Sequence, residues 1–86
     1  MSQLVRNFVK QIDAIVFKTY YSADIGVYTD DFTHDQEKNT YTLVVNLWTI
    51  KSDAVLYIDL GAVADGKMTK TLDQVMNDLQ AQVSSK

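Results

Sequence analysis

Apolar residues recur at three- and four-residue spacing near both ends of the chain, which is the pattern of amphipathic helices. The first stretch runs from Ser2 to about Tyr20 without glycine or proline, with apolar positions at Leu4, Val5, Phe8, Val9, Ile12, Ile15 and Val16. The second runs from Leu72 to about Gln82, and Thr71 and Gln74 at its start have the spacing of a capping box. We therefore expect one helix at each end of the chain.

Three segments between these helices are rich in β-branched and aromatic residues: Ile25 to about Asp30, Thr40 to Ile50, and Ala54 to about Leu60. Phe32 to Asn39 is a polar connection, and Lys51 to Asp53 is a tight one. Such short connections favour antiparallel neighbours. The predicted fold is α+β in the order α-β-β-β-α, a three-stranded antiparallel meander with two flanking amphipathic helices, forming a single domain over residues 1–86.

The second and third strands allow a prediction of register, because side chains alternate between the two faces of a sheet. Pairing Ile50 with Val55 also pairs Leu47 with Ile58 and Val45 with Leu60, which makes one face the core. The same register pairs Trp48 with Tyr57 and Asn46 with Asp59 on the opposite face. The apolar residues expected on that opposite face are Tyr28, Val44, Trp48, Ile50, Val55 and Tyr57.

That second apolar face leaves two arrangements open. Either one helix covers each face of the sheet, or both helices cover the core face and the other face meets another molecule. Trp and Tyr are enriched at the centres of protein interfaces. We therefore expect a non-enzymatic interaction or assembly module, homodimeric or bound to another protein through these residues.

Composition narrows the classes of function. The chain is 47% hydrophobic and 22% charged, which is ordinary for a globular domain, and it contains no cysteine to form a disulfide or a thiolate ligand. It shows neither a signal-peptide pattern nor a long uncharged apolar run, so we expect a cytoplasmic protein without a membrane span. The net charge is −3 with scattered basic residues, which argues against a nucleic-acid surface.

The segment from Gly61 to Lys67 matches the first seven positions of a phosphate-binding P-loop. Met68 stands where that motif needs a hydroxyl for magnesium, and Thr69 comes one residue late. We expect instead a bend at Gly61 and a turn at Asp65-Gly66. A small-molecule or nucleotide-binding protein that uses this loop remains the alternative function.

No other set of residues predicts catalysis or a cofactor. The acidic residues around His34 fit no known metal loop, so we expect a mobile, metal-free connection. We identify no catalytic, cofactor-binding or metal-binding residue and expect no enzyme. The element order is also that of the double-stranded-RNA-binding domain, but this chain lacks that family's lysine cluster and its Gly-Pro-x-His turn, so weak RNA binding is a further alternative.

Overall fold

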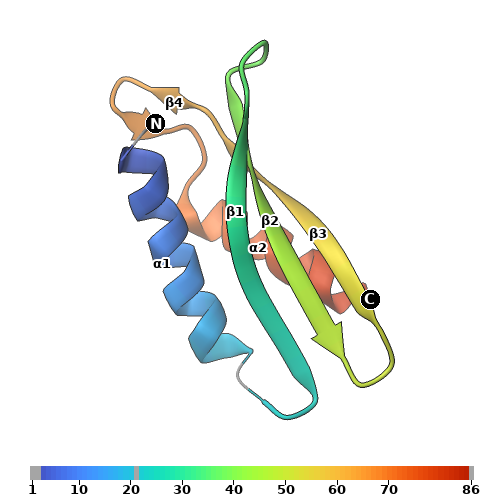
Figure 1. Cartoon of the computed structure of the whole chain (residues 1–86). Helices are drawn as coiled ribbons and strands as arrows, with labels where there is room; N and C mark the ends of the chain where they lie inside the picture. The colour runs from blue at the N-terminus through green and yellow to red at the C-terminus, as the bar shows by residue number, and fades with distance from the viewer. Residues whose placement is uncertain (1–2, 21, 86) are drawn as a thin grey trace.

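A computed structural model describes residues 3–20 and 22–85 of the chain (Figure 1). Its elements are α1 (Gln3–Thr19), β1 (Ile25–Asp35), β2 (Thr40–Thr49), β3 (Asp53–Gly61), β4 (Val63–Ala64), β5 (Lys67–Met68) and α2 (Leu72–Ser84). The strands β1, β2 and β3 form an antiparallel sheet in sequence order. The predicted α+β class and the order α-β-β-β-α are therefore confirmed, while the helix start predicted at Ser2 lies outside the described residues.

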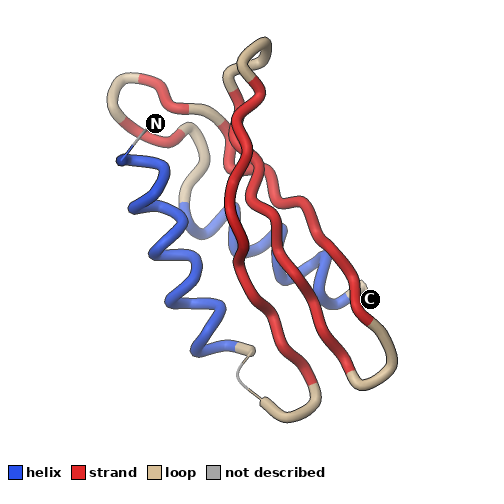
Figure 2. The backbone as a smooth tube through the Cα atoms, viewed as in Figure 1, coloured by secondary structure: helices blue, strands red, loops and turns tan. Residues whose placement is uncertain are grey.

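Both helices pack on the same face of the sheet. α2 crosses behind the three strands and α1 runs along the β1 side (Figures 1 and 2). The core between the layers consists of Val5, Ile12 and Val16 from α1, Val75, Met76, Leu79 and Val83 from α2, and Val27, Tyr41, Leu43, Val45, Leu47, Leu56, Ile58 and Leu60 from the sheet. Of the two arrangements that the sequence left open, the structure has the one in which neither helix covers the second face.

The capping box predicted for the second helix is present. The Gln74 backbone N–H donates to Thr71 Oγ1 at 3.2 Å, and the Thr71 backbone N–H donates to Gln74 Oε1 at 2.8 Å. Two N–H groups that the first turn of α2 would leave unbonded are thereby satisfied. Within the described ranges, no helix has the length and apolar character needed to cross a membrane.

The first strand is longer than predicted. A bulge between Thr29 and Phe32 adds one residue to β1 and lets the strand continue to Asp35, so the predicted connection from Phe32 to Asn39 is wrong. Tyr41 of β2 explains the extension, because Phe32 meets its ring edge-on at 5.9 Å and His34 stacks on it at 4.3 Å. The connection itself is only residues 36–39.

The register predicted between β2 and β3 is also wrong. Trp48 pairs with Asp53 rather than Tyr57, and Tyr57 pairs with Val44. The turn lies two residues earlier than expected, where the Thr49 backbone N–H donates to the Ser52 carbonyl at 2.8 Å. The predicted pairing was chosen to keep Asp59 out of the core. Moving one strand along the other by an odd number of residues would turn Asp59 inward, but moving it by an even number, as here, leaves Asp59 on the outer face.

Because the shift is even, every side chain of β2 and β3 keeps its predicted face. The alternation from Leu43 to Leu47 and from Leu56 to Leu60 places the core where the sequence analysis expected it. Only the cross-strand neighbours change.

The segment after Gly61 forms a small hairpin of its own. Val63–Ala64 pairs with Lys67–Met68, and the turn expected at Asp65-Gly66 is confirmed, with φ angles of 54° and 75° at its two residues. Positive φ at both central positions is typical of two-residue hairpin turns. The turn closes β4 onto β5 instead of leading directly into the helix, which begins later at Leu72.

Candidate functional site

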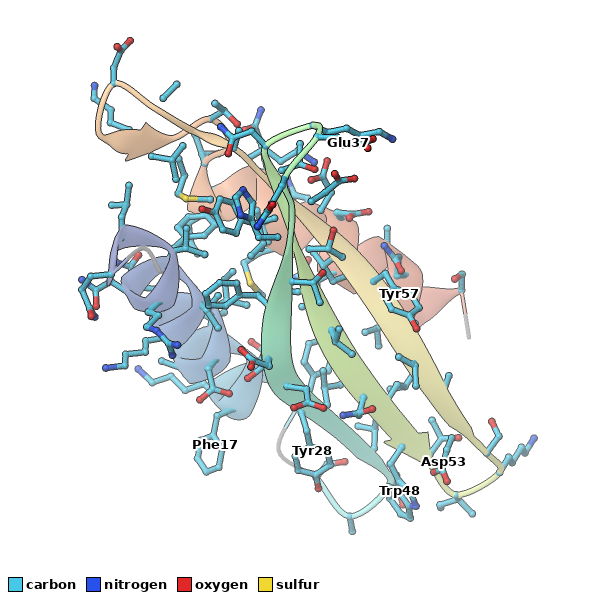
Figure 3. All side chains as sticks on the ribbon, turned by 45° about the horizontal axis from the view of Figure 1, so that its top comes forward. Phe17, Tyr28, Glu37, Trp48, Asp53 and Tyr57 are labelled. Atoms are coloured by element: carbon cyan, nitrogen blue, oxygen red, sulfur yellow. The ribbon has the colours of Figure 1, made fainter. Side chains whose placement is uncertain are left out.

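The side of the sheet turned away from both helices, here called the outer face, carries large exposed apolar side chains. Tyr28, Trp48, Val55 and Tyr57 project from its three strands, with exposed fractions from 42% for Trp48 to 64% for Tyr57. Figure 3 shows Trp48 and Tyr57 on the side of the sheet opposite α2. The fold thus leaves three aromatic side chains in contact with solvent on one surface.

The ladder pairs arrange this face in rows across the strands. One row is Tyr28, Asn46 and Val55. The next row towards the β2–β3 turn is Gly26, Trp48 and Asp53, and Tyr57 lies beside Val44 on the other side of the first row. Side chains directly opposite each other in such rows are about 5 Å apart at Cβ, and diagonal neighbours, at about 7–8 Å, are still within reach of aromatic rings. Trp48 is diagonal to both Tyr28 and Val55, so the apolar groups lie together around Asn46.

Gly26 is placed to receive the ring of Tyr28. A Cβ atom at Gly26 would lie 2.6 Å from Tyr28 Cε2 and 2.8 Å from the Tyr28 hydroxyl oxygen, so the phenol ring covers the backbone at this position. An aromatic side chain over a glycine in a strand shields backbone that would otherwise lack cover. The ring of Tyr28 therefore lies over Gly26, with its other side open to solvent.

Five of the six residues predicted for the interface share the outer face: Tyr28, Val44, Trp48, Val55 and Tyr57. Val44 is half-buried among its neighbours. Ile50 differs, because it lies in the turn beyond the last ladder pair and does not face Val55. Trp48 and Tyr57 share the face without being cross-strand neighbours.

The sequence analysis placed Asp59 on this face but missed two other acidic side chains there, Asp30 and Asp53. Two of these carboxylates, Asp53 and Asp59, occupy outer positions of β3. The third, Asp30 of β1, accepts a hydrogen bond from Asn46 Nδ2 at 3.5 Å. Asp53 was assigned to the tight connection because the turn was placed two residues too late. Its position two residues before Val55 is the period-two signal that would have found it.

Asp59 is the most constrained of these carboxylates. The Gly61 backbone N–H donates to Asp59 Oδ1 at 2.8 Å, and Lys70 Nζ lies 3.2 Å from Asp59 Oδ2. The Gly61 hydrogen bond, together with Lys70, lowers the pKa of Asp59 below its ordinary value. Asp59 is therefore a charged group already engaged within the chain.

A hollow of about 410 Å³ opens beside Trp48 at the β2–β3 end of the outer face. Asp53 and Val55 line its β3 side, and Asn46 lies on its β2 side with Trp48. Trp48 and Asp53 are a ladder pair, and Figure 3 shows them next to each other at the ends of their strands. The hollow therefore joins an aromatic ring and a carboxylate on an apolar surface.

The remaining candidates from the sequence have local structural roles. Thr69, one residue too late for a magnesium ligand, closes the β4–β5 hairpin: its N–H donates to the Ala62 carbonyl at 2.8 Å, and its hydroxyl accepts from the Ala62 N–H at 2.9 Å. His34 Nε2 is 2.9 Å from Asn39 Oδ1 across the β1–β2 turn.

Among the described residues, no group of three or more histidine or acidic side chains is arranged to hold a metal ion. Two further hollows lie between α1 and β1, one near Phe17 and Tyr20 and another near Arg6 and Lys10. Comparison with protein-family models, with curated proteins and with solved structures finds no match to this chain.

Proposed function

We propose that this protein is a non-enzymatic interaction module that binds another polypeptide through its outer face. The observation that carries the proposal is the patch of Tyr28, Trp48, Val55 and Tyr57, which lies opposite both helices. Two-layer folds usually leave a polar surface on the side of the sheet that faces water. Aromatic residues in that position are typical of the centre of a protein interface.

The size of the patch supports an interface rather than a scatter of surface residues. Three aromatic side chains, each with roughly 150–250 Å² of surface, are here about half exposed, so together they present about 300 Å². With Val55 and its neighbours the patch reaches the range of the largest apolar patches on monomers, which are often functional. A standard interface buries about 800 Å² per partner, so the patch supplies an apolar centre that a polar rim completes.

Self-association is the first form of this function to test, because a two-fold dimer would cover the patch with its own copy. We compare the sedimentation of the wild type with that of the double variant Trp48→Glu, Tyr57→Lys. The matched control is the double variant Asn77→Glu, Gln80→Lys, which makes the same changes of charge at two exposed positions of α2, on the other side of the sheet. If the face mediates dimers, the wild type and the α2 variant associate, and the Trp48→Glu, Tyr57→Lys variant is a folded monomer.

Fluorescence of Trp48, the single tryptophan, reports on the same face when the chain is monomeric. A monomer in which acrylamide quenches Trp48 has an outer face free for a different polypeptide. A monomer whose Trp48 is shielded from acrylamide would contradict the proposal, because the chain would then cover this face itself. Association that persists in the Trp48→Glu, Tyr57→Lys variant would equally contradict it.

A further inference from the structure

The charged side chains that share the outer face with the aromatic patch are all acidic. Asp53 and Asp59 occupy outer positions of the β2–β3 ladder, and Asp30, in the bulge of β1, accepts from Asn46 of the same face. The strands β1, β2 and β3 contain no lysine or arginine. Lys70 compensates Asp59 at 3.2 Å. The charge on the face is therefore negative, in keeping with the net charge of −3 for the chain.

The two other carboxylates have different surroundings. Asp30 lines a hollow at the side of β1 together with Arg6 and Lys10 of α1, so cations stand near it. Asp53 forms no ion pair within the described parts of the chain, although Lys51 lies in the adjacent turn. Asp53 is thus the carboxylate of this face whose charge is least compensated.

The partner of Asp53 across the ladder gives its charge a specific setting. Trp48 stands opposite Asp53, and both line the hollow of about 410 Å³. A guanidinium or ammonium group beside a tryptophan ring is attracted by the negative face of the ring. The same cation also forms a charge-assisted hydrogen bond to a carboxylate, which is stronger than a neutral one.

We infer that the polypeptide bound by the outer face presents an arginine or lysine, which seats between Trp48 and Asp53, next to apolar side chains that cover Val55 and Tyr57. This inference rests on the function proposed above and identifies the partner by its chemistry. Arginine fits the hollow better than lysine, because its planar group stacks on an indole and hydrogen-bonds a carboxylate at the same time.

A second copy of the chain is disfavoured as this partner. A two-fold interface brings the same patch of both subunits together, so the acidic groups of one outer face approach those of the other. Like charges placed together across an interface cost binding free energy, and they also slow association. The outer face is apolar enough to bind itself but has the wrong charge to do so well.

The test is a selection of displayed random short peptides against the wild-type protein, followed by titration of the synthesised winners while Trp48 fluorescence is recorded. We expect winners enriched in arginine or lysine next to aromatic or aliphatic residues. Their binding weakens about tenfold in Asp53→Asn, because the amide oxygen still accepts a hydrogen bond but the negative charge that strengthens it is lost. It also weakens between about 50 and 500 mM salt. Asp73→Asn, on α2, is the matched control and leaves the affinity unchanged.

The other outcomes separate the two proposals. Winners that change Trp48 fluorescence but lack basic residues, or bind Asp53→Asn as well as the wild type, overturn the inference about the partner and leave the outer face as a binding surface. Winners that leave Trp48 fluorescence unchanged contradict both proposals, and so does a selection without winners when the chain sediments as a monomer. A dimer that is tight at low salt would also overturn the inference, because the acidic faces would then meet without penalty.

Discussion

Gly61 joins the sheet to the β4–β5 hairpin, at a position where both the backbone conformation and the close packing require glycine. Its φ angle is 78°, in the left-handed region, and a Cβ atom there would lie 2.5 Å from Thr69 Oγ1. The same Thr69 hydroxyl accepts from the Ala62 N–H. A side chain at position 61 therefore strains the backbone and also displaces the group that closes the hairpin.

Gly61→Ala should lower the free energy of unfolding by about 1 to 3 kcal/mol, the usual cost of holding a non-glycine residue in a sparsely populated conformation. Gly66→Ala is the matched control, because its φ of 75° is similar but nothing lies within 4 Å of its Cβ position. Urea unfolding of both variants isolates the contact with Thr69. Equal losses in the two variants would show that the contact contributes nothing.

At the scale of elements, the pairing of β2 with β3 decides which outer residues meet. Two hydrogen bonds show which backbone groups of β2 and β3 point towards each other. The Thr49 N–H donates across the ladder to the Ser52 carbonyl, so the alternate pairs from Thr49 onwards are the hydrogen-bonded ones. The Tyr57 carbonyl points away from β2, where it accepts from Gln82 Nε2 at 3.2 Å. Val44 and Tyr57 are consequently a pair without hydrogen bonds between them, whose Cα atoms are about 4.5 Å apart.

Cysteines placed at Val44 and Tyr57 should form a disulfide under mild oxidation, because this spacing lies within disulfide geometry. Cysteines at Trp48 and Tyr57 should not, because the two positions are offset by four residues, roughly 13 Å along the strands. The chain has no cysteine of its own, so non-reducing electrophoresis and mass spectrometry give an unambiguous result. Cross-linking of the second pair instead of the first would restore the register expected from the sequence.

For the whole molecule, the decisive feature is the asymmetry between the two faces of one sheet. Ile58 is fully buried beneath the helices, whereas its neighbour Tyr57 is 64% exposed on the outer face. Truncating a core side chain removes the free energy of its burial and leaves a cavity, so the protein is destabilised strongly. Truncating an exposed side chain changes the free energy of unfolding little. Adjacent residues of β3 should therefore respond very differently to the same truncation.

Ile58→Ala should lower the free energy of unfolding by about 2 to 5 kcal/mol, and Ile58→Val by about 1 kcal/mol if the alanine variant does not fold. Tyr57→Ala should cost about 1 kcal/mol or less, since it removes strand propensity and little packing. Urea unfolding at low protein concentration measures each value. A Tyr57→Ala loss as large as that of Ile58→Ala would mean that the outer face is packed inside the monomer.

The sequence by itself determined the two helices, the existence of the three main strands, and the face of each side chain within β2 and β3. The spacing of apolar residues fixed both helices, the capping box fixed the start of α2, and the period of two assigned Leu47 and Trp48 to opposite faces. These features follow from the helical period of 3.6 residues and the strand period of two, which do not depend on how the elements pack together.

Only the tertiary structure decided the register, the extension of β1 and the side on which both helices lie. A shift of two residues in the β2–β3 turn preserves the faces, so alternation carries no information about it, and the Thr49 and Ser52 contacts select the turn. Phe32 continues β1 because it packs edge-on against the ring of Tyr41 on the neighbouring strand, a contact that the hairpin forms only once it has folded. The amphipathic pattern of the two helices would also have allowed each helix to cover a different face of the sheet. In the structure both pack on the face that carries Leu43 and Ile58, and this leaves Trp48 and Asp53 on an uncovered surface.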